Sequence, residues 1–275
     1  MNIENISTPP IGLIAGKGLF PLLFAQEAHR NKRNLVVITL KEEMTEDMTP
    51  YAKIIYTISV SKLDSIINAL KKEGVQQAVM AGKVEHTQLF SELIPDFRAA
   101  KLLFKIKDGR ADSILKAVAD EFLKEGIELL PSTTFLKNLI PNTGILTKRK
   151  PTDSEQKNIE FGIKMAQGLA ALDLGQTVVV KSRTVVAVEA MEGTDQCIRR
   201  AGQIGGQNII IVKSAKPNQD LRFDVPIIGL NTLRVMNEVN AKVLAIQADK
   251  TIILEKEQCI HIANQSEICI VAWNR

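Results

Sequence analysis

The N-terminal part of the chain alternates short aliphatic runs with amphipathic segments. Residues 11–40 read IGLIAGKGLFPLLFAQEAHRNKRNLVVITL, which predicts a strand, a glycine turn, a helix opened near Pro21 and a second strand. Further strands are expected in YTISV, QQAVMAG and IELLP, with helices between them. Strands separated by helices favour a mostly parallel sheet covered on both faces. We therefore expect an α/β protein whose residues 1–140 form a doubly wound, Rossmann-like nucleotide- or diphosphate-binding domain.

A proline- and glycine-containing stretch, IPNTGILTKRKPTDSE, then marks a domain boundary. Thr152 and Glu155 beyond it have the spacing of a capping box that opens a helix. The sequence QTVVVKSRTVVAVEA predicts a β-hairpin, and NIIIVK, VLAIQA, TIILE and ICIVAW predict further strands, with helices near DQCIRRAGQI and TLRVMNEVN. Residues 150–275 are thus expected to form a second, mixed α/β domain that carries the catalytic acids.

Composition limits the classes of function. The chain has 275 residues, and its three cysteines lack CxxC spacing, which argues against a disulfide framework and against a zinc knuckle. A net charge of +4 favours phosphorylated or otherwise anionic ligands, while 4% aromatic residues argues against nucleic-acid binding. No apolar run approaches the ~18 residues of a membrane span, and the N-terminus lacks the pattern of a signal peptide. We therefore expect a cytoplasmic protein.

Two glycine turns with lysines follow strands of the first domain. They are AGKG after the first strand and AGK after the fourth, and ligands in such sheets bind beyond the carboxyl ends of strands. If the strand order is the common doubly wound one, both turns line one crevice. The turns contribute the candidate substrate-binding residues Gly16, Lys17, Gly18, Gly82 and Lys83.

The first turn only partly matches a dinucleotide fingerprint. Pro21 occupies the third glycine position, and no acidic residue ends the second strand, so a nicotinamide site is not expected. Small residues at a helix N-terminus still allow a phosphate to approach backbone N–H groups. The alternative is that Gly16 and Gly18 only make a tight turn.

Acidic residues gather at two places in the second domain. Glu189, Glu192 and Asp195 follow one predicted strand, where Thr194 is positioned to cap the next helix through its hydroxyl. Alternatively, Asp195 only complements the helix dipole and the glutamates are solvated.

The second acidic place is DLRFDV. If this stretch is extended, Asp220, Arg222 and Asp224 share one face, with the two aspartate Cα atoms ~13 Å apart. At that separation the two acids would have different roles. The alternative is a surface strand with salt bridges of little energetic weight.

Carboxylates without clustered histidines suggest a hard metal ion. His29, His86 and His261 form no HxxH or HExxH pattern, which leaves zinc poorly supported. Mg²⁺ binds through one or two carboxylates and bridges substrate phosphate oxygens. Phosphate-binding turns in one half and acids in the other therefore suggest cleavage of a phosphoanhydride.

Four stretches in order, IAGKGLFP, DLGQTVVV, VEAMEGTD and KPNQDLRFDVPIIGLNT, resemble the UDP-2,3-diacylglucosamine pyrophosphatase family of lipid A biosynthesis, the branch that does not use the metallophosphoesterase fold. The resemblance runs from about Ile11 to Trp273. It implies Mg²⁺-dependent hydrolysis of UDP-2,3-diacylglucosamine to UMP and 2,3-diacylglucosamine 1-phosphate.

The resemblance also implies roles for individual residues. Asp224 matches the family's essential aspartate, expected to coordinate Mg²⁺ or activate water, and Asp195 matches a second motif acid. The implied catalytic residues are Asp224, Arg222 and Lys216, and the implied metal ligands are Asp224, Asp195 and Asp220. Thr194 and Lys213 join the glycine turns as substrate-binding residues. His86 stands where the family often has an arginine, so its role stays open.

The implied substrate is lipid-linked, which predicts transient peripheral contact with the inner membrane. The segment LIPDFRAAKLLFKIKDGR interleaves apolar residues with Lys101, Lys105 and Lys107 and either faces lipid or simply packs on the sheet. A homodimer is compatible with the sequence, which does not fix the oligomeric state. The alternative functions are a noncatalytic nucleotide-binding regulator and a nucleotide-sugar oxidoreductase.

Overall fold

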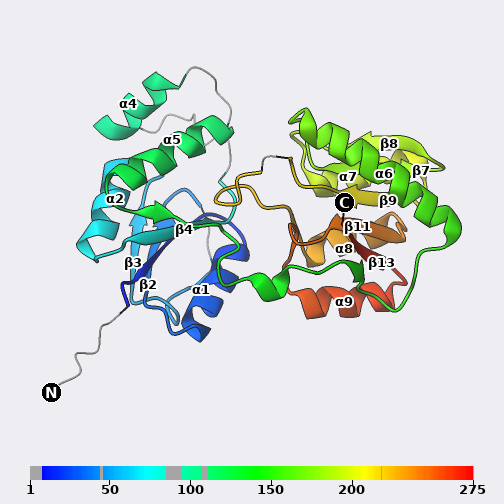
Figure 1. The fold of residues 1–275 in the computed structure, drawn as a ribbon, viewed down its shortest axis with the longest axis horizontal. Helices are drawn as coiled ribbons and strands as arrows, with labels where there is room; N and C mark the ends of the chain where they lie inside the picture. The colour runs from blue at the N-terminus through cyan, green and yellow to red at the C-terminus, as the bar shows by residue number, and fades with distance from the viewer. Residues whose placement is uncertain (1–7, 44–45, 85–93, 107–110, 218, 275) are drawn as a thin grey trace. The chain divides into compact units, whose positions relative to one another are not determined.

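The chain forms two compact units, and each of them is made of two separate stretches of the sequence. A computed structural model describes residues 8–43, 46–84, 94–106, 111–217 and 219–274 (Figure 1). One unit comprises Met1–Leu136 together with Asp220–Phe223, and the other comprises Lys137–Gln219 and Asp224–Arg275. The short insertion of residues 220–223 into the first unit is a feature that the sequence pattern does not indicate.

The N-terminal unit is built on a parallel sheet. Its strands run in the spatial order β3-β2-β1-β4-β5, and every pairing is parallel. The strands are β1 (Ile11–Ala15), β2 (Leu35–Leu40), β3 (Ile54–Ile58), β4 (Gln77–Ala81) and β5 (Glu128–Leu129). This order confirms the doubly wound fold, and it reverses direction between β1 and β4, where ligands of such folds bind.

Helices cover both faces of this sheet (Figure 1). The helices are α1 (Phe20–Arg30), α2 (Leu63–Lys72), α4 (Phe97–Lys105) and α5 (Ala111–Lys124). Alternate strand residues such as Ile14 and Ile38 pack with α2, α4 and α5 in one apolar cluster. Their neighbours, including Leu13 and Val37, are equally buried on the face covered by α1. Pro21 lies in the first turn of α1, where a backbone N–H would have no partner within the helix, so proline, which lacks this group, is tolerated there.

The C-terminal unit is built on a mixed six-stranded sheet in the order β6-β13-β11-β9-β7-β8. β13, β11 and β9 are mutually parallel, whereas β6, β7 and β8 each pair antiparallel. The strands are β6 (Gly144–Ile145), β7 (Thr177–Lys181), β8 (Thr184–Val188), β9 (Ile210–Lys213), β11 (Val243–Gln247) and β13 (Cys269–Trp273). A separate parallel pair joins β10 (Ile227–Ile228) to β12 (Ile252–Ile253). The expected hairpin and the mixed α/β character are both confirmed.

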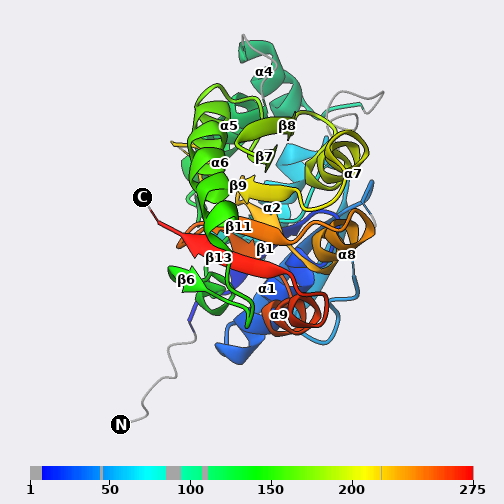
Figure 2. The same ribbon diagram turned by 90° about the vertical axis from the view of Figure 1, so that its right-hand side faces the viewer.

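One helix covers one face of this sheet and three cover the other (Figure 2). The helical segments of this unit are η1 (Lys137–Leu139), α6 (Asp153–Ala171), α7 (Thr194–Gly205), α8 (Leu230–Glu238) and α9 (Lys256–Gln265). Val178 and Val180 pack against α6, while Val179 between them packs on the side of α7, α8 and α9. Thr152 and Glu155 form the capping box expected at the start of α6. Within the described ranges, no helix combines the length and apolarity needed to cross a bilayer.

Helix α6 lies unusually close to the sheet at Gly162. A Cβ atom at this position would lie 2.5 Å from Cγ2 of Val212 in β9. Gly168, six residues further along the same helix, has open space around its Cα atom. The absence of a side chain at position 162 therefore sets the distance between α6 and β9.

We expect Gly162→Ala and Gly168→Ala to change stability in opposite directions. The first substitution overpacks the contact with Val212 and should lower the free energy of unfolding by about 1–3 kcal/mol. The second should raise it by about 0.5–1 kcal/mol, because alanine favours the helix over glycine. Urea unfolding followed by the fluorescence of Trp273, the single tryptophan, reports on this unit. Equal effects of the two substitutions would contradict the close packing at Gly162.

Candidate active site

The two predicted glycine turns lie side by side in the N-terminal unit. Gly16, Lys17 and Gly18 follow β1, and Gly82 and Lys83 follow the neighbouring strand β4. Lys17 and Lys83 form an antiparallel bridge, with N···O distances of 2.8 and 3.0 Å. The structure therefore brings these five candidate residues together at the point where the strand order reverses.

Contact between the turns explains why two of the glycines are needed. A Cβ atom on Gly16 would lie 2.7 Å from the carbonyl oxygen of Lys83, and one on Gly82 would lie 2.7 Å from the backbone of Gly16. The N–H groups of Gly16, Lys17 and Lys83 donate to carbonyl groups of the opposite strand or turn. These three N–H groups therefore hold the turns together. The first turn of α1, beginning two residues after Gly18, still offers a helix N-terminus to an anion.

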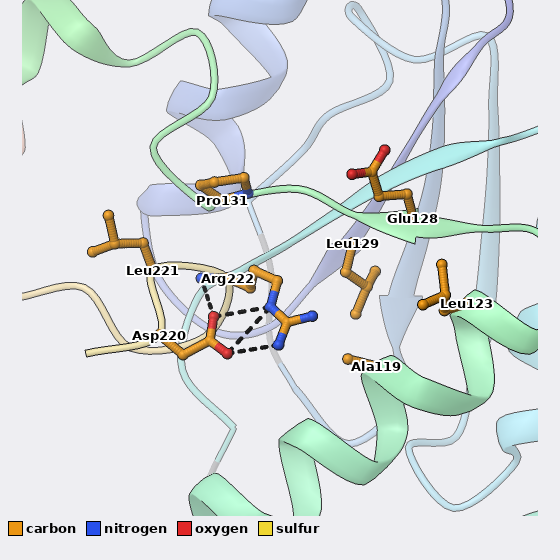
Figure 3. Close-up of a pocket in the computed structure, with 8 residues that line it drawn as sticks. All are labelled: Ala119, Leu123, Glu128, Leu129, Pro131, Asp220, Leu221 and Arg222. Atoms are coloured by element: carbon orange, nitrogen blue, oxygen red, sulfur yellow. Dashed lines mark hydrogen bonds and ion pairs between the residues drawn. The ribbon is translucent and has the colours of Figure 1, made fainter. Parts of the chain in front are cut away.

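A cavity of about 540 Å³ lies elsewhere in the N-terminal unit (Figure 3). Its walls come from α5, from β5 and the residues after it, and from the inserted turn. The lining residues are Ala119, Leu123, Glu128, Leu129, Pro131, Asp220, Leu221 and Arg222. Apolar side chains form most of the wall, and Glu128 and the Asp220–Arg222 ion pair provide its charged part (Figure 3).

The expectation that DLRFDV places three charged residues on one extended face is wrong. Residues 221–223 form a turn, closed by a hydrogen bond from Phe223 N–H to the carbonyl of Asp220 at 3.1 Å. The Asp220 carboxylate accepts the backbone N–H of Arg222 at 3.1 Å, an arrangement that stabilises turns over strands. Asp220 and Arg222 consequently belong to the N-terminal unit, and Asp224 belongs to the C-terminal unit.

Arg222 and Asp220 neutralise each other. The Arg222 guanidinium donates from Nε to Oδ1 at 2.9 Å and from Nη2 to Oδ2 at 2.7 Å. These hydrogen bonds hold the pKa of Asp220 below its usual value and raise the pKa of Arg222. Both carboxylate oxygens of Asp220 are therefore engaged by a cation.

Ser132 anchors the inserted turn to the N-terminal unit. Its N–H donates to the carbonyl of Leu221 at 2.8 Å, and its buried hydroxyl lies 2.8 Å from the carbonyl of Arg222 and 2.7 Å from that of Met80. Phe223 adds an apolar anchor by packing against the core cluster of this unit. The turn is thus held by hydrogen bonds at its centre and by a side chain at its end.

A buried polar cluster lies at the carboxyl end of β9 in the C-terminal unit. Lys213, whose side chain is 7% exposed, donates to the hydroxyl of Thr194 at 2.8 Å and to that of Thr177 at 3.3 Å. Its Nζ lies 3.8 Å from Oε2 of Glu189, whose side chain is 13% exposed. We call Thr177, Glu189, Thr194 and Lys213 the lysine cluster.

The structure corrects the expected role of the Thr194 hydroxyl. Gly193 is the N-cap residue of α7, and no side chain caps this helix. The Thr194 hydroxyl instead donates to Oε1 of Glu189 at 2.8 Å and accepts the hydrogen bond from Lys213. Hydrogen bonds to charged groups are stronger than the hydrogen bond of a helix cap. The Thr194 hydroxyl therefore bonds to Glu189 and Lys213 and does not cap α7.

Asp224 is held by Gln176, the residue just before β7 and next in sequence to the lysine cluster. The Gln176 side-chain amide donates to Oδ2 of Asp224 at 2.9 Å, and Gln176 directly precedes Thr177 of the cluster. Lys216 places its Nζ 3.5 Å from the same oxygen and 2.6 Å from Oδ1 of Asp173. The Asp224 side chain is 37% exposed, so solvent reaches it. Four candidate residues, Asp224, Lys216, Lys213 and Thr194, are therefore grouped within one unit, with both cations beside acids.

Asp195 is held by a different helix. Its Oδ1 accepts from the hydroxyl of Thr232 at 3.2 Å, and its Oδ2 accepts from the side-chain amide of Asn231. Both partners lie in the first turn of α8, so Asp195 ties the starts of α7 and α8 together. None of the hydrogen bonds and ion pairs recorded for the described residues joins Asp195 to Asp224.

Two other sources of chemistry can be assessed from the structure. In the described part of the chain, no group of three or more His, Cys, Asp or Glu side chains converges as a ready-made metal site. Burial raises the pKa of Cys197 and Cys259 to about 12 and raises that of Cys269. Their thiols stay protonated near neutral pH, which argues against a cysteine nucleophile.

His86 lies outside the described residues.

Gln176, Thr177 and Ser132 complete the site without having been selected as candidates from the sequence. Gln176 and Thr177 stand in the DLGQTVVV motif, so a signal for them was present. Ser132 acts through contacts with residues 52 to 90 positions away, and no local pattern marks it.

Comparison with known proteins covers both units. Residues 10–139 match the family model of the LpxI N-terminal domain, and residues 142–271 match that of the LpxI C-terminal domain. The UDP-2,3-diacylglucosamine pyrophosphatase LpxI of Caulobacter vibrioides is 29% identical over 266 residues, covering 92% of this chain and 94% of the relative.

Two solved structures match this chain only weakly. A pyruvate carboxylase of Rhizobium etli matches with a TM-score of 0.29 and 15% identity, over 68% of this chain and 17% of that one. N5-carboxyaminoimidazole ribonucleotide synthetase of Thermotoga maritima matches with a TM-score of 0.24 and 16% identity, over 67% of this chain and 42% of that one. Scores this low do not indicate a common fold.

The lysine cluster predicts strong coupling between Lys213 and Glu189. Lys213→Met leaves the mostly buried Glu189 without its cation and should lower the free energy of unfolding by about 3 kcal/mol. Adding Glu189→Gln removes the uncompensated charge and should recover at least half of that loss. Urea unfolding of the two single variants and the double variant measures the coupling. Additive losses would show that the pair does not interact as described.

Ser132→Ala should loosen the inserted turn. Losing a buried hydrogen bond of about 1 kcal/mol should make local opening about fivefold more frequent. Cleavage by chymotrypsin after Leu221 or Phe223, identified by mass spectrometry, should accelerate by a similar factor. Ser266→Ala, at the end of α9, is the control and should leave this cleavage rate unchanged. An unchanged rate in Ser132→Ala would contradict the anchoring role.

Proposed function

The chain belongs to the LpxI family, since it carries the N-terminal and C-terminal domains of that family in order along nearly its whole length, and we propose that it hydrolyses UDP-2,3-diacylglucosamine. Water attacks one phosphorus of the diphosphate, and the bond from that phosphorus to the bridging oxygen breaks. The products are UMP and 2,3-diacylglucosamine 1-phosphate, within lipid A biosynthesis. We further propose that the protein belongs to the branch of these pyrophosphatases that does not use the metallophosphoesterase fold. The match of both LpxI domain models supports this proposal. The observation that carries the proposal is the position of Asp224 in the C-terminal unit, where its carboxylate is held by Gln176 and lies 3.5 Å from Lys216.

Positive charge near Asp224 suits a diphosphate. Lys216 lies 3.5 Å from the Asp224 carboxylate, and Lys213 at the end of β9 contacts Thr177, the residue after the Gln176 that holds Asp224. Ammonium groups are effective point charges for phosphate oxygens. We assign Lys216 to contact with the diphosphate, while Lys213 and Thr194 form the buried support beneath it. In the N-terminal unit, the paired glycine turns and the start of α1 are the proposed place for the nucleotide.

Asp224 is the residue that best fits a Mg²⁺ ion. Among the described residues, Gln176 and Lys216 both contact Oδ2, and the second oxygen, Oδ1, is available as a ligand. Mg²⁺ takes one or two protein carboxylates and completes its coordination with water and substrate phosphates. When bound, the ion would neutralise charge on the phosphate oxygens and polarise the reacting phosphorus. Gln176 orients the carboxylate by its hydrogen bond.

Asp195 and Asp220 fit a metal less well. Each has both carboxylate oxygens engaged, Asp195 by the start of α8 and Asp220 by Arg222. A metal ion would have to displace these partners before either acid could bind it. We therefore propose that Asp195 positions α7 and that Asp220 holds Arg222 in place, within reach of substrate at the cavity of the N-terminal unit.

Asp224→Asn tests the central assignment. The substitution keeps the shape of the side chain and removes its charge, and we expect the rate of UMP formation to fall at least about a hundredfold. Wild-type activity should require added Mg²⁺ and disappear with a chelator. The variant should stay inactive across the same Mg²⁺ titration, as measured by chromatographic detection of UMP.

Asp249→Asn is the matched control, because Asp249 is an exposed aspartate in a turn of the same unit. It should retain wild-type activity. Equal UMP formation by Asp224→Asn and wild type would refute the role of Asp224. If wild type released no UMP, a noncatalytic nucleotide-binding regulator would be favoured, and hydride transfer with a nicotinamide cofactor would favour an oxidoreductase.

A further inference from the structure

Helix α4 presents large apolar side chains to solvent. Phe97 is 82% exposed and Phe104 is 93% exposed, and Ile94, just before the helix, is 79% exposed. Single exposed apolar residues are common on protein surfaces, whereas a group of this size on one short helix is not. We call Ile94, Phe97, Lys101 and Phe104 the α4 stripe.

The stripe lies on the helix face opposite the protein core. Phe97, Lys101 and Phe104 are spaced four and three residues apart, which places them on one side of an α-helix. Ala99 and Leu102 are the buried residues of α4 and join the apolar cluster beneath it. The helix therefore has a complete inner face, and the two phenylalanines add nothing to the packing of this unit. Figure 1 shows α4 as an outer helix beside α5.

Charge on the stripe is entirely positive. The α4 sequence FRAAKLLFK contains no acidic residue, and its exposed lysines are Lys101 and Lys105. The nearby acids are already engaged. Arg98 lies 2.7 Å from both Asp64 and Glu125, and the carboxylate of Asp96 accepts N–H groups at the start of the helix. Glu121, which lies close enough to Lys105 to interact with it, is paired with Lys124 and Arg98. The exposed face thus combines aromatic side chains with lysines.

We infer that the α4 stripe docks the protein onto an anionic lipid bilayer. Phenylalanines on the apolar side of a basic helix insert at the boundary between headgroups and acyl chains, and lysines beside them contact anionic headgroups. Lys101 lies between the two phenylalanines on the same face of α4. Lys101 can therefore contact headgroups while Phe97 and Phe104 insert. The inference concerns the partner of this surface and does not depend on the proposed reaction.

Other occupants fit the stripe less well. A stable dimer buries roughly 1,200–2,000 Å² in total. The exposed face of a nine-residue helix, which is only about 14 Å long, is too small to form such an interface alone. A bound acyl chain needs a concave site, and the described cavity is lined by α5, β5 and the inserted turn, with no α4 residue. A protruding helix face with cations around its aromatic residues instead matches a broad, negatively charged surface.

Vesicle flotation of the full chain, without substrate, tests the inference. The wild-type protein should float with vesicles of equal parts phosphatidylcholine and phosphatidylglycerol, and should float less with phosphatidylcholine alone or at high salt. Phe97→Ser combined with Phe104→Ser should weaken vesicle binding at least about tenfold, because two aromatic side chains no longer insert. Lys101→Gln combined with Lys105→Gln should weaken binding to the anionic vesicles specifically.

Matched controls come from the C-terminal unit. Leu172→Ser with Met191→Ser removes two exposed apolar side chains, and Lys157→Gln with Lys164→Gln removes two exposed lysines. Both control variants should bind vesicles like wild type. Failure of the wild-type protein to float, or equal losses in stripe and control variants, would overturn the inference.

Two further measurements separate the alternatives. A change of elution volume in size-exclusion chromatography for the phenylalanine variant, with unchanged flotation, would assign the stripe to a second copy of the chain and overturn the bilayer inference. Hydrolysis of detergent-dispersed substrate by the same variant should match wild type, which would confirm that it folds. Because flotation needs no turnover, absence of UMP formation would count against the proposed reaction alone.

Discussion

The structure depends on a five-residue segment that is fastened to two different units. The turn Asp220–Phe223 is held in the N-terminal unit by hydrogen bonds to Ser132 and by the packing of Phe223. The very next residue, Asp224, is held in the C-terminal unit by Gln176. A single peptide bond thus joins the anchor in one unit to the proposed catalytic acid in the other. Side-chain contacts on both sides, rather than regular secondary structure, determine where the Asp224 carboxylate lies.

The fold could be predicted from the sequence because its signals are local. Apolar runs separated by amphipathic segments indicated the parallel sheet, and the spacing of Thr152 and Glu155 indicated the start of α6. Helix α9 was not predicted, since it is polar, has no capping side chain and buries only Cys259 and Ala263. Packing on the sheet and not propensity makes that segment helical.

The site could be predicted only in part, because its decisive contacts join residues far apart in the sequence. The glycine turns are candidates from their positions at strand ends, and the structure brings them together there, whereas Lys213 is a candidate only from the family resemblance. The period-two pattern of DLRFDV suggested a strand, but hydrogen bonds from Ser132 and the Asp220 side chain favour a turn. The sequence predicts that the Thr194 hydroxyl caps a helix, because Lys213 and Glu189, which bind this hydroxyl, are distant or unmarked in the sequence.

The return of Asp220–Phe223 to the N-terminal unit means that this unit is not encoded by one continuous piece of the gene. A fragment truncated after Leu136 would leave the buried hydroxyl and N–H of Ser132 without the carbonyl groups of the turn, and would remove Phe223 from the apolar cluster. The first half of the chain is therefore structurally incomplete until ribosomal synthesis has passed β9 and reached Phe223.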